Sequence, residues 1–82
     1  AIVSSKVCVR GEQFLKVSAD VSPHGWIKVR IFCLSGVLLG EKRAETTCVD
    51  ETVIQIEQRW SQKIEIVFEL NDAVLYSFTL AN

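Results

Sequence analysis

Apolar and polar residues alternate with a period of two along much of the chain, and this alternation constrains the fold more than any other feature. The segment WIKVRIFC at 26–33 places four apolar side chains on one face: Ile27, Val29, Ile31 and Cys33. The segment KIEIVFEL at 63–70 does the same with Ile64, Ile66, Phe68 and Leu70. Because side chains two residues apart in a β-strand point to the same side, both segments predict half-buried antiparallel strands with one face on a core.

Turn-forming residues divide the chain into short segments. We expect seven strands, at residues 2–9, 13–19, 26–34, 37–39, 52–58, 63–70 and 73–80. The segment SPHG at 22–25 is expected to form a sheet corner, because Pro23 cannot donate a hydrogen bond to a strand ladder. Asn71 and Asp72 predict a tight two-residue loop that makes a hairpin of the last two strands. Residues 40–51 predict one long polar connection.

Several short strands with no helical segment between them predict an all-β fold, an antiparallel β-sandwich of the jelly-roll kind. The chain has 82 residues, which is enough for a single domain, 1–82, and apolar residues make up 49% of it. Two other large aromatic residues are placed by this pattern. We expect Trp60 to close the bottom of the core and Tyr76 to bury its ring with its hydroxyl at the rim.

Composition argues against several classes of partner and cofactor. The net charge is −1, with nine basic and ten acidic side chains scattered along the chain, so we expect no nucleic-acid partner. Apolar runs are too short for a membrane helix, so we expect no membrane partner. Cys8, Cys33 and Cys48 form no CxxC pair and have no zinc spacing with His24. We expect no metal and no cofactor. Buried or half-buried thiols are favoured, and a disulfide with one free thiol stays the alternative.

No arrangement of residues in the sequence predicts catalysis, so the chain is not expected to be an enzyme. Glu65 and Glu69 share one face of a strand, where they are expected to be solvated partners of Lys28 and Arg30. Asp20, Asp50 and Glu51 are loop carboxylates, but their spacing is not that of a calcium site, so we expect Asp20 and Asp50 to be turn residues that bond nearby backbone N–H groups.

The candidate ligand-binding residues are Trp26, Lys28 and Arg30, which lie together on the polar face of their strand. An exposed tryptophan ring complements the C–H face of a sugar, and charged neighbours can bond its hydroxyl groups. The alternative is that Trp26 caps a sheet edge or packs against a second layer.

A series of short motifs follows in order along residues 11–80. The motifs consist of Ala19 and Asp20; then Gly25, Ile27 and Val29; then Gly36; then Cys48, Asp50, Arg59 and Trp60; and finally Leu75, Tyr76 and Phe78. In this order and spacing the chain resembles the later half of the C-terminal β-sandwich module that follows the propeller in proteins similar to glycoside hydrolase family 32. The propeller, which carries the catalytic carboxylates of that family, has no counterpart here.

This resemblance implies a non-catalytic accessory module associated with carbohydrate enzymes, with a glycan as a candidate ligand. The alternative function is that of a structural or assembly protein that acts only through protein–protein association. Because the chain resembles half of a larger sandwich, we expect two copies to form a homodimer, with residues 2–9 as a candidate edge strand. The compartment is left open, with a secreted or cell-surface location slightly favoured.

Overall fold

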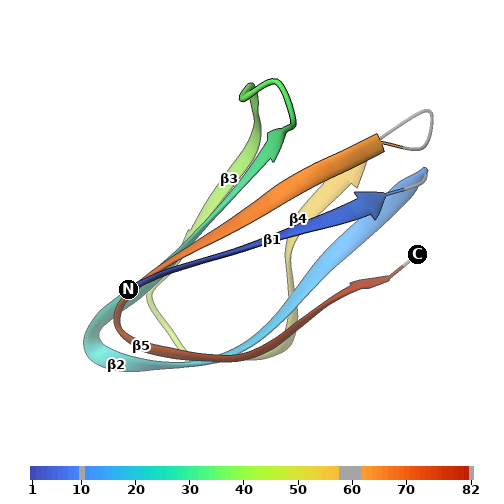
Figure 1. Ribbon diagram of the computed structural model, residues 1–82. Coiled ribbons are helices and arrows are strands. Elements are labelled where there is room, and N and C mark those ends of the chain that lie inside the picture. Colours follow the sequence, from blue (N-terminus) through green and yellow to red (C-terminus); the bar gives the residue numbers. More distant parts are fainter. Residues whose placement is uncertain (10, 58–61, 82) are drawn as a thin grey trace.

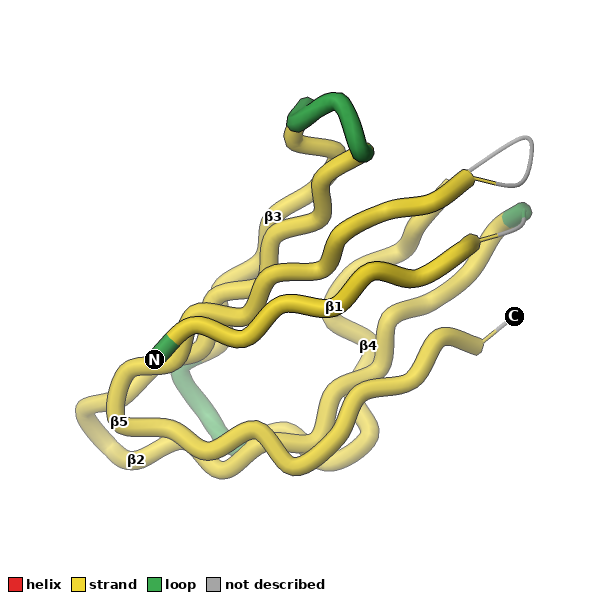
Figure 2. Tube along the Cα trace, viewed as in Figure 1, coloured by secondary structure: helices red, strands yellow, loops and turns green. Residues whose placement is uncertain are grey.

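The computed structural model describes residues 1–9, 11–57 and 62–81, and all of its regular elements are β-strands (Figures 1 and 2). The strands are β1 (Ile2–Val9), β2 (Glu12–Cys33), β3 (Leu38–Ala44), β4 (Cys48–Glu57) and β5 (Gln62–Ala81). Every pairing between them is antiparallel. The prediction of an all-β antiparallel fold without a helix is therefore confirmed for the described residues.

The long strands β2 and β5 pair along nearly their whole length and bend together, so that one sheet doubles back on itself (Figure 1). The four-stranded arm consists of β1, β5 residues 62–71, β2 residues 26–33 and β3, in that order. The three-stranded arm consists of β5 residues 73–81, β2 residues 12–21 and β4. Sequence analysis predicted each long strand as two separate strands, because the turn residues at the bend resemble the ends of strands.

The segment SPHG forms the corner of the sheet, as predicted, and the corner needs a glycine. Residues 22–25 of β2 lie opposite the single residue Asp72 of β5, which makes a wide bulge where both strands turn. Asp72 has a φ of 49°, in the left-handed region that Asp tolerates better than most residues. Gly25 is buried, and a Cβ atom there would collide with the backbone carbonyl oxygens of Asn71 and Asp72. The backbones of the two strands can approach this closely only because residue 25 has no side chain.

The predicted hairpin at Asn71 and Asp72 is wrong. The two segments on either side of these residues do not pair with each other, because both pair with β2. A pair of alternating runs around turn residues is compatible with a hairpin and with a bent strand, and only the partner strand distinguishes them. Here the partner bends at the same place.

The core lies between the two arms, which face each other across it. Phe68 of the four-stranded arm and Phe78 of the three-stranded arm have ring centroids 5.1 Å apart. The core cluster consists of Val9, Leu15, Val17, Ala19, Ile27, Val29, Ile31, Ile56, Ile64, Ile66 and Phe68. Six of the eight predicted core residues in the two alternating segments are therefore confirmed. The other two, Cys33 and Leu70, are only half-buried, because each lies at an end of its arm.

The predicted polar connection at 40–51 is wrong for most of its length. Residues 40–44 belong to β3 and residues 48–51 belong to β4, so only residues 45–47 connect the two strands. Charged residues such as Glu41, Lys42 and Arg43 indicated a loop, but edge strands often carry charges, which hinder pairing with another chain. The strand predicted at 52–58 begins four residues earlier, at Cys48.

The finer prediction of a jelly-roll sandwich is not confirmed. The described strands form one continuous five-stranded sheet rather than two separate sheets. The sheet nevertheless encloses its core between two arms, as the alternation of apolar and polar residues requires.

Candidate ligand-binding face

The three predicted ligand-binding residues lie together on the outer face of the four-stranded arm. Trp26, Lys28 and Arg30 alternate along β2 with the buried Ile27 and Val29, so their side chains point away from the core. All three are half-buried. The face around them is supplied by the neighbouring strands, since β2 pairs with β3 on one side and with β5 on the other.

Arg30 is held between two carboxylates from different strands. Its Nε donates to Glu41 Oε2 on β3 at 2.9 Å, and its Nη1 donates to Glu69 Oε1 on β5 at 3.1 Å. The hydrogen bond to Glu41 is the main cause that raises the pKa of Arg30 above its ordinary value. Partly exposed ion pairs contribute little to stability, but this pair of bonds fixes the guanidinium group and both carboxylates in the middle of the face.

Trp26 is partly covered by a cation. The guanidinium carbon of Arg43 on β3 lies 4.8 Å from the centroid of the Trp26 ring, which is a cation–π contact. Arg43 Nε also lies 3.2 Å from Glu45 Oε1. One of the two faces of the Trp26 ring is thus covered, so a ligand that leaves Arg43 in place can stack only on the other face. The interpretation of Trp26 as an exposed platform is therefore correct for at most one ring face.

The predicted partners of the two basic residues are found only in part. Glu69 binds Arg30 as expected, but Glu65 lies opposite Lys6 and Phe32 in the strand registers. Lys28 makes no hydrogen bond or ion pair with any residue that the structure describes, so its ammonium group is available to a ligand.

Sequence reasoning missed Glu41 and Arg43, because they fell in the segment interpreted as a polar connection. The signal that could have located them is the alternation of LLGEKRA in β3. Glu41 and Arg43 are two residues apart, as expected for one face of a strand. Their Cα partners on β2 are Arg30 and Lys28, respectively.

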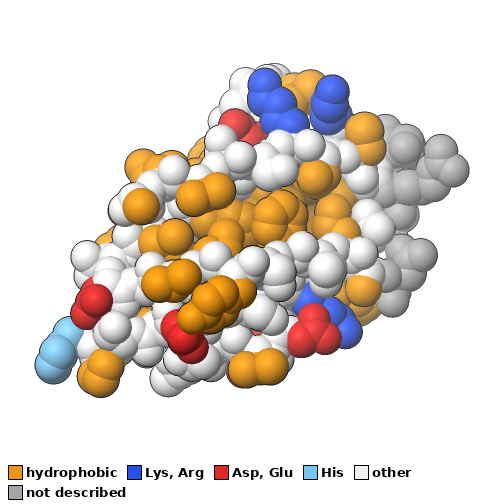
Figure 3. All heavy atoms as spheres, turned by 60° about the horizontal axis from the view of Figure 1, so that its bottom comes forward, with side chains coloured by type: hydrophobic (Ala, Val, Ile, Leu, Met, Phe, Trp, Pro, Cys, Tyr) orange, Lys and Arg blue, Asp and Glu red, His pale blue; other side chains and the backbone are white. Residues whose placement is uncertain are grey.

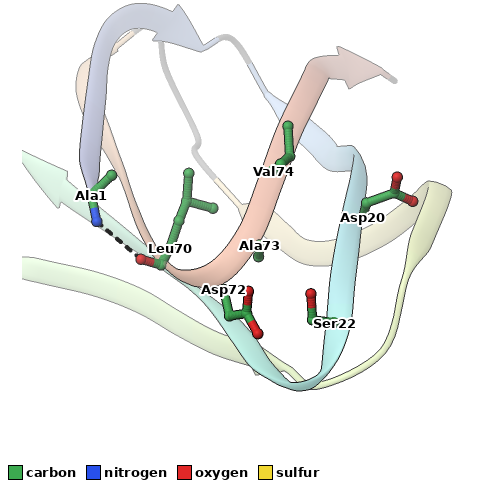
Figure 4. A pocket seen from close by; sticks show the side chains of 7 residues that line it. All are labelled: Ala1, Asp20, Ser22, Leu70, Asp72, Ala73 and Val74. Atoms are coloured by element: carbon green, nitrogen blue, oxygen red, sulfur yellow. Dashed lines mark hydrogen bonds between the residues drawn. The ribbon is translucent and has the colours of Figure 1, made fainter.

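A pocket lies at the corner of the sheet, with a volume of about 480 Å³ (Figure 4). It is lined by Ala1, Asp20, Ser22, Leu70, Asp72, Ala73 and Val74. Asp20 accepts a hydrogen bond from the Tyr76 hydroxyl at 2.8 Å, which raises the pKa of Tyr76, instead of capping a backbone N–H. No group of three or more His, Cys, Asp or Glu residues that could hold a metal ion is found among residues 1–9, 11–57 and 62–81.

Sequence analysis also predicted buried positions for Tyr76 and Trp60. Tyr76 is 65% exposed, so the prediction of a buried ring is wrong. Its strand changes register with β2 between Ser18 and Ala19, and this shift turns Tyr76 to the outer side. Trp60 lies outside the described residues.

The three cysteines are free thiols in three different environments. Cys8 is exposed, Cys33 is half-buried and Cys48 is buried, so the alternative with a disulfide is wrong. The Cys33 sulfur lies 2.9 Å from the Ser35 hydroxyl oxygen, and this hydrogen bond lowers the Cys33 pKa. Burial raises the pKa of Cys48.

Comparisons with protein-family models, with curated proteins and with solved structures give no match. The resemblance to the C-terminal module of glycoside hydrolase family 32 therefore stays a prediction. Two of the residues that carry it, Arg59 and Trp60, lie outside the described residues. Within the described residues, the structure has no helix that is long and apolar enough to cross a membrane.

Proposed function

We propose that this protein is a non-catalytic binding module that takes a hydroxyl-rich ligand, such as a glycan, on the outer face of the four-stranded arm. The observation that carries the proposal is the position of Trp26 beside Lys28 and Arg30 on a sheet face. The half-exposed indole ring offers an apolar surface to the C–H face of a sugar. The charged groups next to it bond hydroxyl groups, and charge-assisted hydrogen bonds are stronger than neutral ones.

The ion pairs support this proposal by giving the face a fixed geometry. Glu41 and Glu69 hold the Arg30 guanidinium from two sides at 2.9 and 3.1 Å. A ligand that meets groups already held in place loses less side-chain entropy on binding than one that must order them. Lys28, which has no partner among the described residues, adds a donor that costs no existing interaction.

A glycan array followed by calorimetric titration of the best ligand tests the proposal. We expect Trp26→Ala to abolish measurable binding and Lys28→Ala to weaken it. The matched control is Tyr76→Ala, which removes an exposed aromatic ring from the other arm and should leave affinity unchanged. Arg43→Ala identifies the ring face: affinity is unchanged if the sugar uses the free face and rises if the sugar displaces Arg43. A folded wild-type domain that binds no glycan would exclude the proposal.

A second candidate function is association with another protein, and a separate observation favours it. The side of the molecule between β1 and residues 73–81 of β5 is open, and hydrophobic side chains are visible in the middle of this face (Figure 3). Four large apolar residues on these two strands are exposed, namely Val3 on the core-facing side of β1 and Ile2, Val74 and Tyr76 on the outer faces. Exposed apolar surface next to unpaired strands is typical of interaction sites.

A further inference from the structure

Within residues 1–9, 11–57 and 62–81, β1 pairs with β5 alone, so the outer edge of β1 carries backbone groups without a strand partner. The Ala1 ammonium group donates to the Leu70 carbonyl oxygen at 3.0 Å (Figure 4), and the Leu70 N–H donates to the Ala1 carbonyl oxygen at 2.9 Å, so the two residues form a hydrogen-bonded pair. In an antiparallel ladder such pairs alternate with non-hydrogen-bonded pairs. The uninterrupted register from Ile2↔Glu69 to Val9↔Gln62 therefore directs the N–H and C=O groups of odd-numbered β1 residues to β5. The groups of the even-numbered residues point outward: Ile2, Ser4, Lys6 and Cys8.

This edge lacks the features that usually prevent edge pairing. β1 has eight residues with no proline, no bulge and one charged side chain, Lys6. Natural edge strands are usually protected by prolines, bulges, several charges or a covering segment. A regular strand edge with free donors and acceptors fits another extended strand, because backbone hydrogen bonds then continue the ladder.

The sequence of β1 is complementary to itself in one antiparallel register. The free backbone groups of two copies can bond only in a register that places even-numbered residues of one β1 opposite even-numbered residues of the other. The register centred on Ser5 opposes Ile2 to Cys8 and Ser4 to Lys6 of the second copy, so all four residues with free backbone groups are paired. The register centred on Lys6 opposes two like charges, which is unfavourable. The register centred on Ser4 leaves Cys8 unpaired.

The Ser5-centred register also continues the apolar face. Val3 of one copy lies opposite Val7 of the other, twice per dimer, as close non-hydrogen-bonded pairs. Val3 is 45% exposed and Val7 is half-buried in the single chain. Pairing would cover both side chains beside the core.

We propose that the free edge of β1 binds β1 of a second copy of this chain in the antiparallel register centred on Ser5. The result is a symmetric dimer in which the two four-stranded arms form one continuous sheet. This inference is independent of glycan binding and goes beyond the proposed function, since it uses the strand edge and not the Trp26 face. A failed glycan array would leave it unaffected.

A disulfide placed on the two-fold axis tests the register. The variant Ser5→Cys is made in a background in which Cys8 and Cys33 are replaced by serine, and Cys48 is buried. Two non-hydrogen-bonded Ser5 positions would have Cα atoms about 4.5 Å apart. This distance lies within the disulfide range of about 4.4–6.8 Å. We expect nearly complete covalent dimer after mild oxidation at micromolar concentration.

Ser4→Cys in the same background is the matched control. In the proposed register the two Ser4 positions are diagonal neighbours about 7–8 Å apart, which is too far for a disulfide. Equal cross-linking of both variants, or stronger cross-linking through Ser4, would overturn the register.

Sedimentation of the uncross-linked chain tests the dimer itself. We expect a species of twice the 9.2 kDa chain mass at micromolar concentration. Ser4→Pro should yield a folded monomer, because it removes an outward N–H that has no role in the β1–β5 ladder. Ser4→Ala keeps that N–H and should stay dimeric. A wild-type species at 9.2 kDa would overturn the proposal. The same result is expected if another segment of the same chain covers β1.

Discussion

The bent sheet has two sides at which an edge of one arm faces an edge of the other, and these two sides are built differently. On one side, β3 of the four-stranded arm and β4 of the three-stranded arm follow each other in sequence, and residues 45–47 cross directly from one arm to the other. The Thr47 hydroxyl oxygen accepts a hydrogen bond from the Val21 N–H at 3.1 Å and so attaches this connection to β2. On the other side, β1 and residues 73–81 of β5 are far apart in sequence. In the strand registers, β1 pairs with residues 62–69 of β5 and residues 73–81 pair with β2, so these two edges are not paired with each other.

A short chain connection can therefore close one side of a doubled sheet, whereas the other side can be closed only by strand pairing. A chain of this length has limited surface to bury, so the open side keeps apolar groups partly accessible. Side chains such as Val7, Phe78 and Leu80 pack against the core but stay half-buried. The closed side needs no partner, whereas the open side gains hydrogen bonds and burial from one.

The largest expected effect on stability comes from two aromatic residues in the core, one on each arm. Phe68 is fully buried, whereas its ring neighbour Phe78 is only half-buried near the open side. We expect Phe68→Ala to reduce the free energy of unfolding by about 3–5 kcal/mol, as for a fully buried aromatic residue. Phe78→Ala should cost clearly less. Chemical denaturation measures both, and equal losses would mean that the open side is as well packed as the rest.

The corner that joins the arms should be nearly as sensitive. We expect Gly25→Ala to destabilise the domain by about 3 kcal/mol, because the added Cβ collides with backbone carbonyl groups that cannot move without unbending β5. Gly40→Ala is the matched control. Its Cβ would meet Ile54 at an ordinary 3.7 Å, so it should stabilise the strand by up to about 1 kcal/mol. Similar thermal melts for both variants would show that the two strands do not meet tightly at the corner.

The connection on the closed side should contribute a smaller amount. Thr47→Val keeps the size of the side chain but removes the hydroxyl that bonds the Val21 backbone. We expect a loss of about 1 kcal/mol in unfolding free energy, the usual net value of one hydrogen bond. Thr46→Val is the control, since Thr46 is also exposed and its hydroxyl makes no bond with the described residues. No difference between the two variants would show that the Thr47 bond does not hold this side closed.

The smallest expected effect separates the two faces of β2. Lys28→Ala should change the free energy of unfolding by no more than about 0.5 kcal/mol, because Lys28 has no partner among the described residues. Ile31→Ala on the opposite face should cost about 2–5 kcal/mol. If Lys28→Ala is the more damaging change, the two faces have been assigned the wrong way round.

The sequence predicts faces well and connections poorly. The alternation in residues 26–33 and 63–70 identified the core face, because a strand with one buried side has an apolar residue at every second position. The corner at SPHG was also predicted, since Pro23 and Gly25 have backbone requirements that few structures satisfy. Each of these signals is local.

The remaining features depend on residues far apart in the chain. Whether Asn71 and Asp72 form a hairpin or a bend is decided by β2, which lies some fifty residues earlier, and no local pattern records that pairing. The charged residues of β3 form a strand because their segment pairs with residues 27–32 of β2, which lie earlier in the chain. For the same reason, the residues of the candidate face on β2 and Glu69 on β5 were predicted, whereas Glu41 and Arg43 on β3 were missed.

Amide hydrogen exchange along β1, measured at two protein concentrations, tests the central claim that this edge is free in the single chain and paired in a dimer. The amides of Val3, Ser5 and Val7 should be protected at both concentrations, because they bond to β5. The amides of Ser4 and Lys6 should exchange rapidly in dilute solution and become protected as the concentration rises. Protection of Ser4 and Lys6 in dilute monomer, or rapid exchange at every concentration, would contradict the account.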